Sequence, residues 1–297
     1  MNRTLLKKAQ SVIDKRRQFA DERARENLLI ALKNEEFKKL YTKQKELEIE
    51  LARKDAYGEK VDYSQINKII EQQEHLLKNK NLNGTDIRPN YECKLCGDTG
   101  YIKGDPCTCL KQEINKVLLS FSGFTHKLAT FEENTMNHPA YPLMQKWCDT
   151  QSNKLNIFIY GHTGTGKTFL TECIADRLIK NSRVTLFVTA FNLNNALLNY
   201  HISFDANRND IIDPFLTTEV LIIDDLGSEP QLKNVTKEYL YLIINERMLN
   251  NLPTIVTTNL EPGEILTNYG ERIFSRLINK KTSIAINLDG EDLRLKK

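Results

Sequence analysis

The motif at residues 161–168 constrains the fold of this chain more than any other feature. It reads G-x-x-x-x-G-K-T and stands between an apolar run, Leu155 to Tyr160, and a stretch typical of a helix, Phe169 to Lys180. A strand that enters such a loop and leaves it as a helix presents backbone N–H groups and a positive helix end to phosphate oxygens. Lys167 is then expected to reach the β- and γ-phosphates of a nucleoside triphosphate, and the Thr168 hydroxyl to bind Mg²⁺. The expected phosphate-binding residues are Gly161, His162, Thr163, Gly164, Thr165, Gly166, Lys167 and Thr168. The alternative is a glycine-rich turn followed by Lys-Thr by chance.

Two further apolar runs end in polar residues that complete a site for nucleotide hydrolysis. Val220 to Ile223 is a β-branched run typical of a buried parallel strand, and Asp224 and Asp225 follow it. Asp224 is expected to hold Mg²⁺ through water, and Asp225 to orient the attacking water. Glu more often fills the second role, so hydrolysis is expected to be slow. Asn259, at the end of a third strand, is placed to contact the same water or the γ-phosphate. The alternatives are a helix cap or solvated turn for the acids, and a turn residue for Asn259.

The alternation of strands and helices after residue 127 predicts an α/β fold with a five-stranded parallel sheet covered on both faces. An additional strand between the phosphate-loop strand and the acid-bearing strand would fit one class of P-loop ATPases. The expected strands are Leu155–Tyr160, Val184–Thr189, Val220–Ile223, Thr254–Thr258 and Ser283–Asn287. The expected helices are Tyr141–Ser152, Phe169–Lys180, helices within Phe191–Leu216, Asn234–Asn250 and Gly270–Asn279.

The first 82 residues predict long amphipathic helices. They contain one Gly (Gly58), no Pro and dense mixed charge, with leucines such as Leu28, Leu32 and Leu40 at helical spacings. A helical arm that docks on a partner and a self-packed helical hairpin both fit this pattern. A linker, Asn81 to Asn90, follows. The expected domains are therefore residues 1–82, 83–126 (linker and Cys-rich knuckle) and 127–297 (nucleotide-binding domain).

Four of the six cysteines lie within seventeen residues, as Cys93-x₂-Cys96 and Cys107-x-Cys109. Two short chelating loops of this kind can close a tetrahedral Cys₄ shell around Zn²⁺, and metal binding would then supply most of the folding energy of the segment. Because Cys-x-Cys is less usual than Cys-x₂-Cys, His75 or His126 is an alternative ligand. The four cysteines could instead hold an iron–sulfur cluster or remain unligated thiols. Cys148 and Cys173 are expected to be small buried residues.

The composition limits the partners of the chain. The net charge is +3, from 42 basic and 39 acidic residues, so contact with nucleic acid requires a local patch rather than a generally basic surface. There is no run of eighteen apolar residues, and the charged N-terminus lacks the apolar core of a signal peptide. We therefore expect a cytoplasmic protein with no membrane partner.

Basic residues near the C-terminus complete a pattern that resembles a known family. Arg272 and Arg276 lie four residues apart just beyond the third strand, and Arg294 follows near the end of the chain. Together with the run Ile222-Ile223-Asp224-Asp225-Leu226-Gly227 and the Cys-rich knuckle, they resemble the bacterial replicative-helicase loaders of the DnaC/DnaI type. These loaders are AAA+ P-loop ATPases related to the initiator DnaA and to the IstB transposition ATPases. The resemblance covers residues from about 127 to 297, and the knuckle more loosely.

The resemblance implies roles for the arginines and the partners. Arg276 would be an arginine finger that reaches the γ-phosphate of a neighbouring subunit, supported by Arg272, and Arg294 would contact the bound nucleotide of its own chain. Surface salt bridges are the alternative for all three. The implied function is ATP-dependent loading of the hexameric replicative helicase onto single-stranded DNA by a self-associated oligomer. Contacts with DNA would come from residues 191–216, which contain Tyr200, His201, Phe204 and Arg208. An IstB-type transposition helper and a nucleotide-gated zinc DNA-binding regulator are the alternatives.

Overall fold

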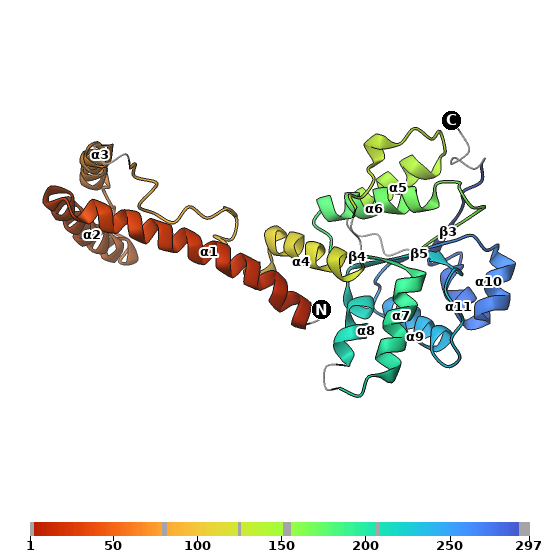
Figure 1. The fold of residues 1–297 in the computed structure, drawn as a ribbon. Coiled ribbons are helices and arrows are strands. Elements are labelled where there is room, and N and C mark those ends of the chain that lie inside the picture. Colours follow the sequence, from red (N-terminus) through yellow and green to blue (C-terminus); the bar gives the residue numbers. More distant parts are fainter. Residues whose placement is uncertain (1–2, 79–81, 124–125, 151–155, 206–207, 291–297) are drawn as a thin grey trace. The chain divides into compact units, whose positions relative to one another are not determined.

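A computed structural model of the chain describes residues 3–78, 82–123, 126–150, 156–205 and 208–290 (Figure 1). The chain forms two compact units. One consists of Ser11–Cys107, and the other of Thr108–Lys297 together with Met1–Gln10. Of the expected boundaries, Asn81, Ser152 and Leu155 lie outside the described residues. The expected division into three domains stays a prediction.

A parallel sheet of five strands forms the centre of the Thr108–Lys297 unit. Its strands are β3 (Asn156–Tyr160), β4 (Thr185–Thr189), β5 (Val220–Leu226), β6 (Thr254–Thr258) and β7 (Ser283–Asn287), in the spatial order β4-β5-β6-β3-β7. Strand β5 begins as a continuous apolar run because both faces of the sheet are covered there, and Leu221, Ile222 and Ile223 are fully buried. Strand β6 lies between β3 and β5, so the predicted additional strand is confirmed.

Helices cover both faces of this sheet. They are α5 (Ala140–Asp149), α6 (Lys167–Lys180), α7 (Ala190–Ile202), α8 (Asn209–Thr217), α9 (Thr236–Leu249), α10 (Pro262–Tyr269) and α11 (Glu271–Leu277). Figure 1 shows α5 and α6 on one face and α7, α8 and α9 on the other. A core cluster that includes Trp147, Leu170, Ile222 and Ile255 joins α5 and α6 to the strands. The predicted α/β architecture is confirmed, although the sequence did not predict α10.

Helix α4 (Thr108–Phe121) packs against β4 in the same unit, although the sequence assigned these residues to the linker and knuckle. Its buried apolar residues are spaced by four, at Leu110, Ile114 and Leu118. The buried side chain of Asn115 also fixes the start of β4, because its amide donates to the Arg183 carbonyl (2.9 Å) and its oxygen accepts the Thr185 N–H (2.9 Å). This spacing of apolar residues predicts a helix, but the nearby cysteines led the sequence analysis to assign the segment to the metal site.

The Ser11–Cys107 unit is helical up to residue 78, as predicted. Helices α1 (Arg3–Leu32), α2 (Glu35–Ala56) and α3 (Ser64–Lys78) precede a two-stranded hairpin, β1 (Tyr101–Ile102) and β2 (Asp105–Pro106). Helix α2 ends at Ala56, just before Gly58, where φ is +74°. Among the helices in the described ranges, none combines the length and the apolar character that crossing a lipid bilayer requires.

Part of the helical region packs on itself. Phe37 and Leu77 are buried in a small cluster with Ala31. Beside them, the buried Gln73 side chain of α3 donates to Gln44 of α2 (2.8 Å). A self-packed hairpin of α2 and α3 is therefore present. Large apolar side chains nevertheless remain exposed, namely Phe19 (68%), Leu29 (55%) and Ile49 (57%).

Candidate nucleotide and metal sites

The phosphate loop joins β3 to α6, as the motif predicts. Gly161 has a φ of +143°, and a Cβ atom there would lie 2.5 Å from the backbone oxygen of Leu288, so this close approach requires glycine. Gly166 has a φ of +92° and caps α6, which begins at Lys167. The first N–H groups and the positive end of α6 therefore point at the loop, which is the arrangement that binds phosphate.

Lys167 is held over the loop by the loop's own backbone. Its Nζ atom donates to the carbonyl oxygens of Gly161 (2.7 Å) and His162 (2.6 Å), and the residue is only 7% exposed. The Thr165 hydroxyl also donates to the His162 carbonyl (2.9 Å), which closes the turn. The positive charge of Lys167 is thus fixed at the position where the motif places the outer phosphates.

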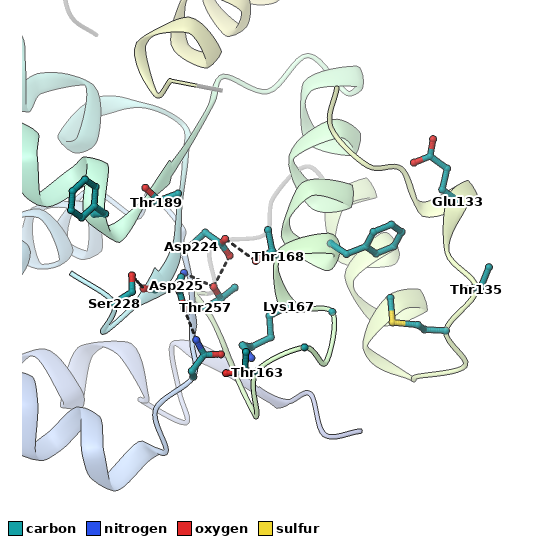
Figure 2. A pocket seen from close by; sticks show the side chains of 16 residues that line it. Glu133, Thr135, Thr163, Lys167, Thr168, Thr189, Asp224, Asp225, Ser228 and Thr257 are labelled. Carbon is teal, nitrogen blue, oxygen red and sulfur yellow. Dashed lines mark hydrogen bonds between the residues drawn. The ribbon is translucent and has the colours of Figure 1, made fainter. Parts of the chain in front are cut away.

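Asp224 lies at the end of β5 inside a cage of hydroxyl groups (Figure 2). Its Oδ2 atom accepts from Thr168 (2.9 Å), and its Oδ1 atom accepts from Thr257 (2.7 Å) and Thr171 (3.3 Å). Burial raises the pKa of Asp224, the hydroxyl bonds oppose this effect, and the charge of Asp225 adds to it. The carboxylate and the Thr168 hydroxyl are hard oxygen donors within bonding reach of each other, so they fit a shared Mg²⁺ ion.

Asp225 is joined to Asn259, the residue at the end of the third predicted strand. The Asn259 side-chain amide donates to Asp225 Oδ1 (2.6 Å), and the Asp225 N–H donates to the Thr257 hydroxyl (2.8 Å). Asp225 has a φ of +59°, which is uncommon for a residue other than glycine. The structure therefore brings together the ends of β5 and β6 as the sequence predicted.

These groups line one cavity of about 920 Å³. From the phosphate loop and α6 it includes Thr163, Gly164, Gly166, Lys167 and Thr168, and from the strand ends Asp224, Asp225 and Asn259. The sequence did not predict its other lining residues, which are Glu133, Thr135, Met136, Phe169, Thr189, Phe191, Ser228 and Thr257. Thr189 and Thr257 carried a signal, since both are polar residues at the C-terminal ends of predicted strands. The cavity is large enough for a nucleotide, and its polar groups gather at the phosphate loop.

Arg272 and Arg276 lie on α11, and neither is among the described residues that line this cavity. The Arg276 guanidinium contacts side chains of α9 and the backbone of its own helix. It donates to Asn245 Oδ1 (3.0 Å), the Tyr241 hydroxyl (3.0 Å) and the Arg272 carbonyl (2.9 Å), and it stacks on the Tyr241 ring (4.6 Å). The structure therefore does not bring these arginines to the nucleotide site of the same chain. Arg294 lies outside the described residues.

The four predicted cysteines form one cluster. The Sγ atoms of Cys93, Cys96, Cys107 and Cys109 all lie within 4.8 Å of one another. Two Zn–S bonds of about 2.3 Å at a tetrahedral angle place their sulfurs roughly 3.8 Å apart. The Cys93–Cys107 separation of 3.7 Å matches this value and is far too long for a disulfide. No histidine of the described ranges joins the cluster; His126 contacts Glu172 instead (3.1 Å).

Asp98, which sequence reasoning missed, shapes the loop that carries the first two cysteines. Its fully buried carboxylate accepts the N–H groups of Glu92 (2.8 Å) and Cys93 (2.9 Å) and pairs with Arg16 of α1 (2.5 Å). Burial raises the pKa of Asp98, but these bonds outweigh burial and hold the pKa below its usual range. The Cys93 backbone is thus fixed independently of any metal.

Cys148 and Cys173 are buried as predicted, and burial raises the pKa of both thiols to about 12. They therefore remain protonated and unreactive near neutral pH.

The aromatic residues of the segment proposed to contact DNA differ in how far they are exposed. Phe204 is 96% exposed just after α7. Tyr200 stacks with Arg208 (4.2 Å) and meets Tyr239 edge-on, and His201 contacts the Tyr239 hydroxyl (3.0 Å). Among the described residues of this segment, Phe204 is the aromatic side chain most exposed for stacking; Phe191 is also half-exposed (51%) but lines the nucleotide cavity.

The strand order, the phosphate loop and the acids of β5 with the polar end of β6 define a P-loop ATP-binding domain of the AAA+ type. The chain belongs to the family of IstB-like ATP binding proteins, whose family model matches residues 143–297. The predicted resemblance to the helicase loaders and their IstB relatives is confirmed.

Two curated relatives and one solved structure illustrate this similarity. The replicative helicase loader DnaI of Bacillus subtilis is 28% identical over 188 residues, which cover 56% of this chain and 58% of DnaI. The replicative helicase loader DnaC of Escherichia coli is 23% identical over 159 residues, which cover 51% of this chain and 64% of DnaC. A crystal structure of the DnaC helicase loader is 19% identical, with a TM-score of 0.49, and covers 54% of this chain and 97% of that structure. The chain thus spans less than two thirds of the length of these curated relatives.

Proposed function

We propose that this protein is an ATP-dependent loader that delivers a hexameric replicative DNA helicase to single-stranded DNA. The observation that carries the proposal is the combination of a complete ATP site with a separate helical and Cys-rich unit that exposes apolar side chains. The names of the loaders among the relatives give the replicative helicase as the first partner to test.

The ATP site supports slow hydrolysis by residues of this chain. Lys167 neutralises the outer phosphates, and Thr168 and Asp224 hold Mg²⁺, which supplies charge stabilisation to the phosphoryl group when bound. Asp225, oriented by Asn259, positions the attacking water. Its short side chain keeps the carboxylate farther from the phosphorus than a glutamate would, so turnover is slow. Stimulation of turnover by DNA and by assembly is what the resemblance to the loaders implies.

The arginines of α11 act on a neighbouring chain. A guanidinium that serves the nucleotide site of the next subunit must lie away from its own, and Arg276 is bonded to α9 rather than to its own cavity. Arg272 supports it, and Arg294 covers the nucleotide of its own chain. Hydrolysis then requires an oligomer.

The cysteine cluster holds one structural Zn²⁺. The Cys93–Cys107 separation of 3.7 Å fits tetrahedral zinc, and four thiolate ligands would leave no open position, which is typical of structural zinc rather than catalytic zinc. The metal stabilises a segment that has little core of its own.

The exposed apolar side chains of α1 and α2 bind the helicase. The test replaces Phe19, Leu29 and Ile49 with Ser, singly and together, in the full-length chain. Because all three are more than half exposed, each change should alter the free energy of unfolding by less than about 0.5 kcal/mol. The matched control is Leu249→Ser, which removes an equally exposed side chain (65%) from α9 of the other unit.

Co-elution with the host's replicative helicase on size exclusion is the measurement. The triple variant should lose co-elution while it keeps ATP affinity, and the Leu249→Ser control should retain both. Co-elution that survives the triple change would show that α1 and α2 do not dock on the helicase.

The family match favours a second function, that of an IstB-type transposition helper, which would bind duplex DNA and a transposase. Fluorescence anisotropy with labelled single-stranded and duplex oligonucleotides in the presence of ATP separates the two functions. The loader should prefer the single strand and lose affinity in Phe204→Ala, because stacking on one aromatic ring contributes about 1–3 kcal/mol. Preference for the duplex would favour the transposition helper. Binding without any turnover would favour a nucleotide-gated zinc DNA-binding regulator.

A further inference from the structure

The two acids of the ATP site are consecutive residues, which poses a geometric problem. Successive side chains of a regular strand point to opposite faces of the sheet, yet Asp224 and Asp225 both line the same cavity. The pairing of β5 with β6 explains how this occurs. Ile223 pairs with Val256 and Leu226 with Thr258, so three steps along β5 match two steps along β6. The extra residue forms a β-bulge at the acids, and a bulge re-aims side chains in this way.

The bulge requires support from its surroundings. Asp225 takes a φ of +59°, which L-residues avoid unless neighbouring contacts hold them there. Ser228 holds the Asp225 carbonyl, through its N–H (3.2 Å) and its hydroxyl (2.8 Å). On the other side, the Asp225 N–H donates to the hydroxyl of Thr257, which is only 1% exposed.

The Thr257 hydroxyl contacts both acids at once (Figure 2). Because it accepts the Asp225 N–H (2.8 Å), its own proton is directed to Asp224 Oδ1 (2.7 Å). Of the two acids, Thr168 and Thr171 contact only Asp224, and the Asn259 side chain contacts only Asp225. The Thr171 hydroxyl also donates to the Thr168 carbonyl (2.9 Å). Thr257 is therefore the group that ties the backbone of one acid to the side chain of the other.

We propose that Thr257 is a positioning residue that holds Asp224 and Asp225 in register for Mg²⁺ and for the attacking water. By engaging Oδ1 of Asp224 it leaves Oδ2 directed at Thr168, the expected metal partner. By holding the Asp225 N–H it keeps the bulge that turns the Asp225 carboxylate into the cavity. The proposal rests on the ATP-binding and hydrolysis part of the proposed function and is independent of helicase loading.

The test compares Thr257→Val, which keeps the branched shape but lacks the hydroxyl, with Thr257→Ser, which keeps the hydroxyl. Thr171→Val is the matched control, because it removes a buried hydroxyl that contacts Asp224 but not Asp225. ATP affinity in EDTA, the half-saturating Mg²⁺ concentration for ATP binding, and turnover at saturating Mg²⁺ are measured on the full-length chain.

Affinity in EDTA should stay within about twofold of wild type in both Thr257 variants, because Thr257 makes no hydrogen bond to the phosphate loop among its described contacts. Thr257→Val should raise the half-saturating Mg²⁺ concentration and lower turnover by at least about tenfold each, the effect of losing one hydrogen bond to a charged group. Thr257→Ser should restore most of both, and Thr171→Val should change the Mg²⁺ dependence more than the turnover.

The proposal is overturned if Thr257→Val matches wild type in both measurements, or if Thr257→Ser is as impaired as Thr257→Val. An equal loss of affinity in EDTA would also overturn it, since this would indicate general damage to the site. If wild-type turnover is undetectable, the Mg²⁺ dependence decides alone, and that result counts against the proposed hydrolysis rather than against the role of Thr257.

Discussion

Replacing Gly161 with alanine should test how closely the phosphate loop approaches the segment after β7. The new Cβ atom would lie 2.5 Å from the Leu288 oxygen and 3.0 Å from the Leu288 carbonyl carbon. That backbone cannot retreat easily, because the Leu288 N–H donates to the Tyr160 carbonyl (2.7 Å). Holding alanine at a φ of +143° costs about 1–3 kcal/mol, and forcing an atom into a packed contact costs about another 1–3 kcal/mol. The free energy of unfolding should therefore fall by about 2–6 kcal/mol.

Urea unfolding followed by tryptophan fluorescence measures this loss. Trp147 is the single tryptophan, is 3% exposed and belongs to the same core cluster as Leu288, so its signal reports on this unit. The matched control is Gly263→Ala inside α10, where a Cβ meets nothing within 4 Å and alanine should stabilise the helix by about 0.5–1 kcal/mol. An unchanged urea midpoint and slope for Gly161→Ala would refute the reasoning from close approach.

The remaining predictions concern the chemistry of the sites. Lys167→Ala should weaken ATP binding by about 10- to 150-fold in a titration with a fluorescent analogue, because a charge-assisted contact contributes about 1.5–3 kcal/mol; unchanged affinity would contradict the phosphate-loop assignment. Asp225→Asn should keep ATP affinity but lower turnover in a phosphate-release assay, since asparagine tolerates the positive φ but lacks the charge; retained turnover would exclude its role. Replacing Cys93 and Cys96 with Ser should remove about one zinc per chain by elemental analysis while ATP binding survives, and iron or no metal in the wild type would exclude the zinc site. Arg276→Ala should bind ATP but not hydrolyse it, and mixing it with Lys167→Ala should recover activity; no recovery from co-assembled, folded mixtures would exclude action between chains.

The sequence predicted the parts of the fold whose signals are local. The five strands are apolar runs between turns, so most of their ends were predicted within one or two residues. Strand β5 is the exception, because its polar bulge looks like a strand end and the strand continues to Leu226. Helix α10 is short, begins at Pro262 and follows a turn-like segment, so periodicity gave little indication of it.

The sequence predicted those parts of the candidate site whose residue types and spacing indicate a specific chemical role. The phosphate loop and the acids have few competing explanations, whereas the role of Thr257 depends on the register between β5 and β6. The contacts of Arg276 depend likewise on how α11 packs against α9, which no local pattern in the sequence encodes.

The contacts that Arg276 makes within its own chain affect how two chains would recognise each other. The Arg276 guanidinium already makes three hydrogen bonds and stacks on an aromatic ring. If it moved to contact a second chain it would lose these contacts, so the net free energy gained is the difference between the new contacts and the old ones. Contacts with a neutral surface of a second chain would be weaker than the contacts that Arg276 already makes. The negative charge of a terminal phosphate would offer more, since charged hydrogen bonds are about twice as strong as neutral ones. Arg276 would therefore contribute little to the overall affinity between two chains but would favour a neighbour that holds a terminal phosphate over one that does not. The contacts that Arg276 must give up would oppose assembly until such a phosphate is present.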